Sequence, residues 1–234
     1  DLGATIVMDP VSSIARNEAT GRFAVKGSQG TYDASSVILA AGAHPRLAGF
    51  EGEKHYSGHG VSYCATCDGM FYRNNSAAEE AIFLTRFANK VTLIVRKDHL
   101  RAQASVIEQL DKNEKIEVRL LTSILKVEGN ELPTMLTFRD NATGETHVET
   151  YEEGSFGVFV LVGRVPETEL VADLIERDRA GYAITDERMA TRTPGLFVAG
   201  DARQKPLRQI VTAAADGASA ATSAAAFLGQ PVEG

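Results

Sequence analysis

The stretch SAAEEAIFLTRFANKVTLIV, residues 76–95, joins a helix pattern directly to a strand pattern. Ser76 and Glu79 have the spacing of a capping box, and alanine and leucine residues repeat behind them at helical intervals. The apolar run KVTLIV at 90–95 is typical of a strand buried on both faces. A helix followed at once by a buried strand indicates an α/β fold.

The rest of the chain repeats this alternation of strand and helix patterns. Glycine-bearing segments at 50–60 and 152–157 divide the chain into three parts, and the outer two each contain a strand that ends in small residues and glycine. This pattern suits one sheet interrupted by an inserted domain. Strands are expected at 4–8, 22–27, 35–43, 116–121, 123–128, 135–140, 146–151, 156–163 and 195–201, and further helices at 98–113, 169–176 and 208–228.

The charge composition of the chain bears on which kinds of partner it can bind. The formal net charge is −7 and no block of five Lys or Arg residues occurs, which argues against nucleic acid and against anionic membranes. No apolar run reaches the roughly 18 residues of a membrane span, and no secretory signal pattern opens the chain. We expect a cytoplasmic protein. Because the chain starts without Met in a strand-like run, we also expect that further residues precede it.

Both cysteines lie in the segment VSYCATCDG, residues 61–69. Cys64 and Cys67 have the C-x-x-C spacing of a redox dithiol, and Asp68 beside them can act as a general acid or base. With His55 and His59 they also form four zinc ligands within thirteen residues. Spacing alone leaves a redox dithiol, a zinc site and a pair of plain core cysteines open.

Five segments in order resemble the low-molecular-weight thioredoxin reductases: VILAAGAHPR, SYCATCDG, NSAAEEAIFLTRFANKVTLIVRK, GRVPET and GLFVAGDARQKPLRQIVTAAADGASAA. The resemblance covers essentially the whole chain. It implies a homodimer with two Rossmann-like domains that bind FAD and NADPH. NADPH would reduce FAD, FAD would reduce the Cys64–Cys67 disulfide, and the dithiol would reduce thioredoxin. Cys67 would be the flavin-proximal thiol, Cys64 the thiol that exchanges with thioredoxin, and Asp68 the acid/base.

The resemblance also implies cofactor residues. Asp201 would accept from a ribityl hydroxyl of FAD, and the start of the last helix would direct its amides and positive dipole end toward the flavin. Without the resemblance, a turn aspartate that caps a helix is a better explanation of AGD than a cofactor site, and the segment RQIVTAA that follows reverses this balance. The flavin set is Ala41, Gly42, Gly163, Gly200, Asp201, Arg208, Gln209 and Ile210, and the nicotinamide set is Asn75, Ser76, Glu79, Arg96, Lys97 and Arg101.

Three cations follow the strand at 90–95, namely Arg96, Lys97 and Arg101. Cations at the tip of a Rossmann unit suit a 2′-phosphate, hence NADPH. The family has His-Arg-Arg where this chain has Val95-Arg96-Lys97, so charge is kept while bidentate binding is weakened. Glu167 likewise stands where the family has Asn.

No G-x-G-x-x-G loop occurs, although the family has two of them. A strand and a glycine turn are expected between Arg73 and Asn74, so a gap is predicted at 73/74. The predicted domains are 1–53 and 157–234, which form an incomplete FAD domain, and 54–156, the inserted NADPH and dithiol domain. The alternatives are a flavin-dependent dithiol oxidoreductase with another partner, and a non-catalytic remnant or zinc-binding module.

Overall fold

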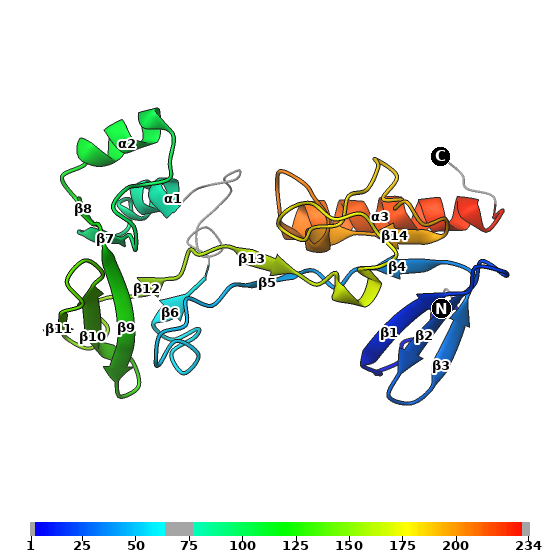
Figure 1. The fold of residues 1–234 in the computed structure, drawn as a ribbon, viewed down its shortest axis with the longest axis horizontal. Helices are drawn as coiled ribbons and strands as arrows, with labels where there is room; N and C mark the ends of the chain where they lie inside the picture. The colour runs from blue at the N-terminus through cyan, green and yellow to red at the C-terminus, as the bar shows by residue number, and fades with distance from the viewer. Residues whose placement is uncertain (1–2, 64–76, 231–234) are drawn as a thin grey trace. The chain divides into compact units, whose positions relative to one another are not determined.

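The computed structural model describes residues 3–63 and 77–230, which belong to two compact units (Figure 1). Unit 1 comprises Asp1–His44 and Arg164–Gly234, and unit 2 comprises Pro45–Gly163. Unit 2 is therefore inserted into unit 1 along the chain. The predicted domain boundaries at 53/54 and 156/157 both fall inside unit 2, and the assignment of a cofactor to each domain stays a prediction.

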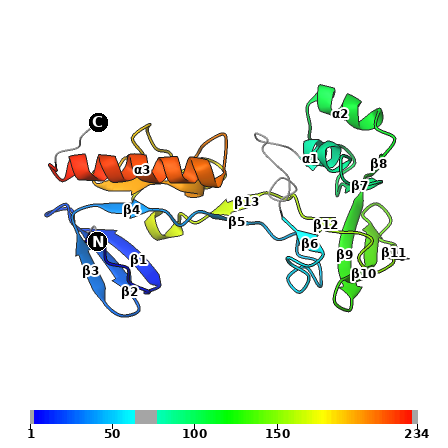
Figure 2. The same ribbon diagram turned by 180° about the vertical axis from the view of Figure 1, so that it is seen from behind.

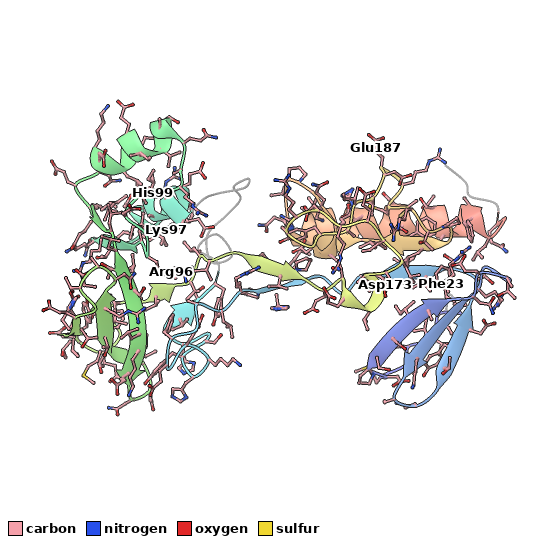
Figure 3. The ribbon with its side chains drawn as sticks, viewed as in Figure 1. Phe23, Arg96, Lys97, His99, Asp173 and Glu187 are labelled. Atoms are coloured by element: carbon pink, nitrogen blue, oxygen red, sulfur yellow. The ribbon has the colours of Figure 1, made fainter. Side chains whose placement is uncertain are left out.

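Unit 1 begins with a three-stranded antiparallel sheet, β1(Val11–Arg16), β2(Phe23–Gly27) and β3(Thr31–Ala34), in the order β1-β2-β3. Phe23, labelled in Figure 3, is fully buried and anchors the sheet to the core of the unit. Asp9 fixes the segment before β1, since its carboxylate accepts from the Ser28 amide at 2.6 Å and from the Tyr32 hydroxyl at 2.9 Å.

The second part of unit 1 is a parallel pair covered by a helix. β4(Val37–Leu39) pairs with β14(Leu196–Val198), and α3(Ile210–Phe227) runs alongside them (Figure 2). Each strand of this pair is only three residues long, and all three residues of β14 are buried. The short 3₁₀ helices η1(Glu169–Val171) and η2(Gly200–Ala202) precede and follow β14 in the sequence.

Unit 2 contains its own parallel pair, β7(Val91–Ile94) with β8(Ile116–Arg119), and the helices α1(Ala77–Leu84) and α2(Ala104–Asp111). Their shared core includes Ala78, Ala81 and Leu93. The helix-then-strand unit predicted from residues 76–95 is therefore present, and the prediction of an α/β fold is confirmed.

The remaining strands of unit 2 form an antiparallel sheet and a second parallel pair. β9(Thr122–Gly129), β10(Pro133–Asp140) and β11(Thr146–Thr150) are ordered β11-β10-β9, and the turn between β10 and β11 contains residues 141–144. β6(Val61–Ser62) pairs with β12(Val158–Phe159). β5(Ala43–Pro45) and β13(Arg164–Pro166) form a further two-stranded sheet where the chain passes between the units.

Several predicted elements are wrong or too long. Residues 4–8 form no strand, and Ile6 and Met8 are exposed, because no described strand pairs with this segment. The strand predicted at 156–163 is only β12, and the helix predicted at 169–176 is only η1. In the second and third of these segments the apolar residues Val158, Val160, Val171 and Ile175 are buried, but burial alone does not supply the hydrogen-bonding partner that a longer strand needs.

Candidate cofactor and dithiol sites

The turn after β14 carries the predicted flavin aspartate. Gly200 has φ +74°, a conformation that glycine adopts without the steric penalty of a side chain, and it begins η2. The backbone therefore turns sharply at the carboxyl end of the strand. Asp201 follows directly, at the position where open α/β sheets bind their ligands.

A buried ion pair holds this turn. Lys205 Nζ lies 2.9 Å from Asp216 Oδ2, with side chains only 5% and 12% exposed. The same Asp216 oxygen accepts from the Gly200 amide at 3.1 Å, so the carboxylate on α3 is fixed to the turn after β14. Lys205 also lies 3.8 Å from Asp201 Oδ1, and Arg203 Nε lies 3.8 Å from Asp216 Oδ2. Two cations thus offset two carboxylates in this small region.

Two buried polar atoms at this site have no hydrogen-bond partner among the described residues: Asp201 Oδ1 and Arg208 Nε. A buried polar group without a partner costs about 1–3 kcal/mol. The Arg208 guanidinium stacks on Tyr182, with its carbon 3.8 Å from the ring centroid. One acceptor and one donor are therefore held in place without a hydrogen bond from the described residues, although Lys205 lies 3.8 Å from the acceptor, as expected for a site that binds a polar ligand.

The helix start beside these atoms is well formed. Gln209 is the N-cap of α3 in an extended conformation, and its amide donates to Thr212 Oγ1 at 3.1 Å. Ile210 is 89% exposed. The amides of this first turn carry the positive end of the helix dipole, so the arrangement favours an anionic or electron-rich group.

The other predicted flavin residues lie at the end of β4 and before β13. Ala41 and Gly42 follow β4, and Gly42 O accepts from the Glu167 amide at 2.9 Å. Gly163 precedes β13, and its carbonyl accepts from the Arg46 amide at 2.9 Å. A Cβ on Gly42 or Gly163 would meet nothing within 4 Å, so both glycines border open space.

Unit 2 has a cavity of about 700 Å³ after β7. Of the three predicted cations, Arg96 and Lys97 line it, and Figure 3 labels both on the segment that follows β7. Arg101 is exposed and does not line it. Glu79 lies in the first turn of α1. Next to the cavity segment, Asp98 is paired with His99 at 2.6 Å, an interaction that lowers the pKa of Asp98.

The predicted dithiol residues Cys64, Cys67 and Asp68, together with Asn75, Ser76 and the suspected gap at 73/74, lie outside the described residues. Tyr63 is the last described residue before them. Its pKa is raised by burial first and then by the buried carboxylate of Glu53, which accepts from the Ala48 amide at 2.8 Å. Within residues 3–63 and 77–230 no cluster of three His, Cys, Asp or Glu side chains suits a metal ion.

The sequence did not point to several residues that contact the predicted site residues or line the same cavity. Lys205, Asp216 and Tyr182 look like ordinary surface or core residues in the sequence, and only tertiary contacts bring them to Asp201 and Arg208. Arg139, more than forty positions from Arg96, lines the same cavity. Of these four, a spacing rule within one helix or loop would find only Lys205, which is four positions from Asp201.

The parallel pairs, covering helices and charged loops after β14 and β7 define an α/β protein of the class that has Rossmann-like, FAD- and NADPH-binding domains. The chain belongs to the pyridine nucleotide-disulphide oxidoreductase family, whose model matches residues 3–217. No helix in the described ranges is long and apolar enough to cross a membrane.

Within this family the chain resembles thioredoxin reductases over most of its length. It is 42% identical to the thioredoxin reductase of Peptoclostridium acidaminophilum over 240 residues, covering 97% of this chain and 75% of that one. Identity to the Peptoclostridium litorale enzyme is 43% with the same coverage. The Streptococcus pyogenes thioredoxin reductase structure matches with TM-score 0.79 and 37% identity over 94% of this chain and 74% of that chain. The resemblance inferred from the sequence is confirmed.

Proposed function

We propose that the protein is an NADPH-dependent thioredoxin-disulfide reductase that uses FAD and the Cys64–Cys67 pair. The observation that carries the proposal is the buried Asp201 oxygen after β14, which accepts no hydrogen bond from the described residues, in a chain that matches a thioredoxin reductase over 97% of its length. Flavin and nicotinamide use follows from the family. NADPH in preference to NADH is supported by Arg96 and Lys97 at the cavity after β7.

The residues present fit FAD. Asp201 would accept from a hydroxyl group, Arg208 would donate to an anionic or carbonyl oxygen, and the first turn of α3 would present its amides. When bound, FAD supplies the step between the two-electron donor NADPH and a disulfide. Gly42 would leave room for the cofactor, because no described atom lies within 4 Å of the place that its Cβ would take.

The dithiol step follows from thiol–disulfide exchange. The Cys64 thiolate attacks the disulfide of thioredoxin, forms a mixed disulfide and releases one thioredoxin thiolate. The Cys67 thiolate then attacks the Cys64 sulfur, which closes the Cys64–Cys67 disulfide and releases the second thioredoxin thiolate. Asp68 would exchange protons with these thiols. Two electrons pass to thioredoxin, and both of its sulfurs leave as thiols after protonation.

We further propose a homodimer that acts in the reducing cytoplasm, where a dithiol can turn over. Two other functions are distinguishable from this one. A related flavin-dependent dithiol oxidoreductase would oxidise NADPH with a different protein disulfide. A zinc-binding remnant would hold metal through His55, His59, Cys64 and Cys67, and would bind no flavin.

The test is thioredoxin reduction by wild type and by Cys64→Ser, with FAD present. Wild type should oxidise NADPH in step with thioredoxin reduction. Cys64→Ser should lose this turnover but still let NADPH reduce the bound flavin, because Cys64 acts only after flavin reduction. Undiminished thioredoxin turnover in Cys64→Ser, or stoichiometric zinc without flavin in wild type, would refute the proposal.

A further inference from the structure

The cavity after β7 is lined by cations from two separate parts of the chain. Arg96 and Lys97 come from the segment after β7, and Arg139 is the penultimate residue of β10. None of the three makes a side-chain hydrogen bond or ion pair with a described acidic residue. Their charges are therefore available to a ligand. Three cations line this one cavity in a chain of formal net charge −7, although Lys97 also lies near Asp98 and helps to lower the pKa of that carboxyl.

Asn141 links the two cationic segments of the cavity by hydrogen bonds to both Arg96 and Arg139. Its side-chain amide donates to the Arg96 carbonyl at 3.0 Å and to Ser123 Oγ at 2.9 Å, and its oxygen accepts from Arg139 Nε at 3.3 Å. Both amide hydrogens and the amide oxygen are thus engaged by the protein. Asn141 holds the β10–β11 turn against the segment after β7, and it leaves the terminal nitrogens of Arg139 free to contact a ligand.

The charge of the cavity favours a doubly charged anion. Its lining residues include three cations and one carboxylate, Asp140. The Asp140 Oδ1 oxygen already accepts from the amides of Ala142 at 2.7 Å and Thr143 at 3.0 Å. A phosphomonoester carries close to two negative charges at neutral pH and three acceptor oxygens, which match a guanidinium fork beside a lysine.

We propose that Arg139 is a specificity-determining residue that contacts the 2′-phosphate of NADPH, with Asn141 as its positioning residue. This inference rests on the proposed function, because it assumes that the cavity binds a nicotinamide dinucleotide. Relative to the family pattern, Lys97 replaces one arginine and Val95 replaces the histidine. Arg139 supplies a guanidinium from β10 that restores bidentate recognition of phosphate.

The test measures binding of adenosine 2′,5′-bisphosphate and of adenosine 5′-monophosphate to the FAD-loaded full chain by calorimetry. Arg139→Met should weaken the bisphosphate about tenfold or more, because it removes a charge-assisted hydrogen bond, and should change the monophosphate less than about twofold. Arg139→Lys should recover part of the loss. Asn141→Ala should weaken the bisphosphate by a smaller factor. The matched control Arg179→Met, an exposed arginine of unit 1, should change neither.

Equal loss of both nucleotides in Arg139→Met, no loss of either, or failure of wild type to prefer the bisphosphate would overturn the proposal. The melting temperature of Arg139→Met should match that of wild type. If it does not, the proposal is judged on Arg139→Lys and Asn141→Ala instead, by whether each variant weakens the bisphosphate more than the monophosphate. A wild type that prefers the bisphosphate through Arg139 but does not reduce thioredoxin would refute the proposed function alone. The two proposals can therefore fail separately.

Discussion

Lys205 Nζ lies 2.9 Å from Asp216 Oδ2, and the pair is almost wholly removed from solvent. The Lys205–Asp216 pair connects α3 to the turn that carries Asp201. Through the Gly200 amide, Asp216 fixes the turn after β14, and Lys205 places a positive charge 3.8 Å from Asp201. A buried ion pair adds little stability relative to an apolar pair, so its value here lies in fixing the charged residues of the site.

Removing one partner should be costly. Lys205→Met leaves the buried Asp216 carboxylate with its 2.9 Å partner missing, and we expect a loss of about 3 kcal/mol in the free energy of unfolding of unit 1. Urea unfolding of the flavin-free chain measures it. The control Lys112→Met breaks an exposed pair with Glu108 and should cost less than about 0.5 kcal/mol. Equal losses in the two variants would contradict the role of burial.

Asp201→Ala should separate cofactor binding from stability. Asp201 Oδ1 is buried and accepts no hydrogen bond from the described residues, and Lys205 keeps its 2.9 Å partner Asp216 when the longer 3.8 Å contact with Asp201 is lost. The removal of Asp201 should therefore change the unfolding temperature of the flavin-free chain little. FAD affinity should fall about tenfold or more. Fluorescence titration with FAD, together with thermal melts, gives both quantities. An Asp201→Ala variant that is destabilised while binding FAD normally would show that the carboxylate has a structural role.

Tyr182 should act through its aromatic face. Tyr182→Phe keeps the ring on which Arg208 stacks at 3.8 Å, whereas Tyr182→Leu removes it. A cation–π contact of this kind contributes about 1 kcal/mol, so Leu should weaken FAD binding by about fivefold and Phe by much less. The same titration compares them. If Phe and Leu weaken binding equally, stacking does not position Arg208.

The sequence predicts those site residues that lie next to a strand or helix with a clear local pattern. Asp201, Arg96 and Lys97 follow strands with strong local patterns, and Arg208 precedes a helix with a strong pattern, so their positions could be inferred. Residues 4–8 have the composition of a strand but no described partner strand, which composition cannot reveal. Arg139 reaches the cavity through the β10–β11 hairpin.

The same limit applies to the supporting residues. Lys205 and Asp216 are separated by eleven positions, and no helical or strand period pairs them. Their contact depends on how α3 packs beside the turn after β14. Local patterns therefore identified residues proposed to touch a ligand, while the residues that hold them in place emerged only from the three-dimensional structure.

Glu117 should give unit 2 a defined pH dependence. Hydrogen bonds from Arg119 first and Lys90 second lower the pKa of Glu117 from 4.5 to about 2. Because the folded pKa lies below the ordinary one, the stabilisation is complete above about pH 4.5 and is lost as pH falls toward about pH 2.

Glu117→Gln should therefore cost about 1 kcal/mol near neutral pH, after allowing for solvent screening of a carboxylate that is 37% exposed. The difference from wild type should shrink steadily as the pH falls below about 4.5. Unfolding by urea across this range measures it. Glu131→Gln, at an exposed site with no described ion pair, should show no such trend. A pH-independent difference would refute the assignment.

Gly60 and Gly58 provide a matched pair before β6. Both have positive φ, but a Cβ on Gly60 would lie 2.3 Å from Pro133 Cδ, while one on Gly58 would meet nothing within 4 Å. Gly60→Ala should therefore destabilise unit 2 by about 1–3 kcal/mol more than Gly58→Ala. Thermal unfolding compares the two, and similar melting temperatures would contradict close packing at Gly60.

The proposed transfer of electrons from NADPH through FAD and the Cys64–Cys67 pair to thioredoxin can be followed in the visible spectrum of the purified protein under anaerobic conditions. NADPH is added first and oxidised thioredoxin second. We expect a flavin band that bleaches with NADPH and returns when thioredoxin is added. A protein that binds no flavin, or a bleached flavin that thioredoxin does not reoxidise, would contradict it.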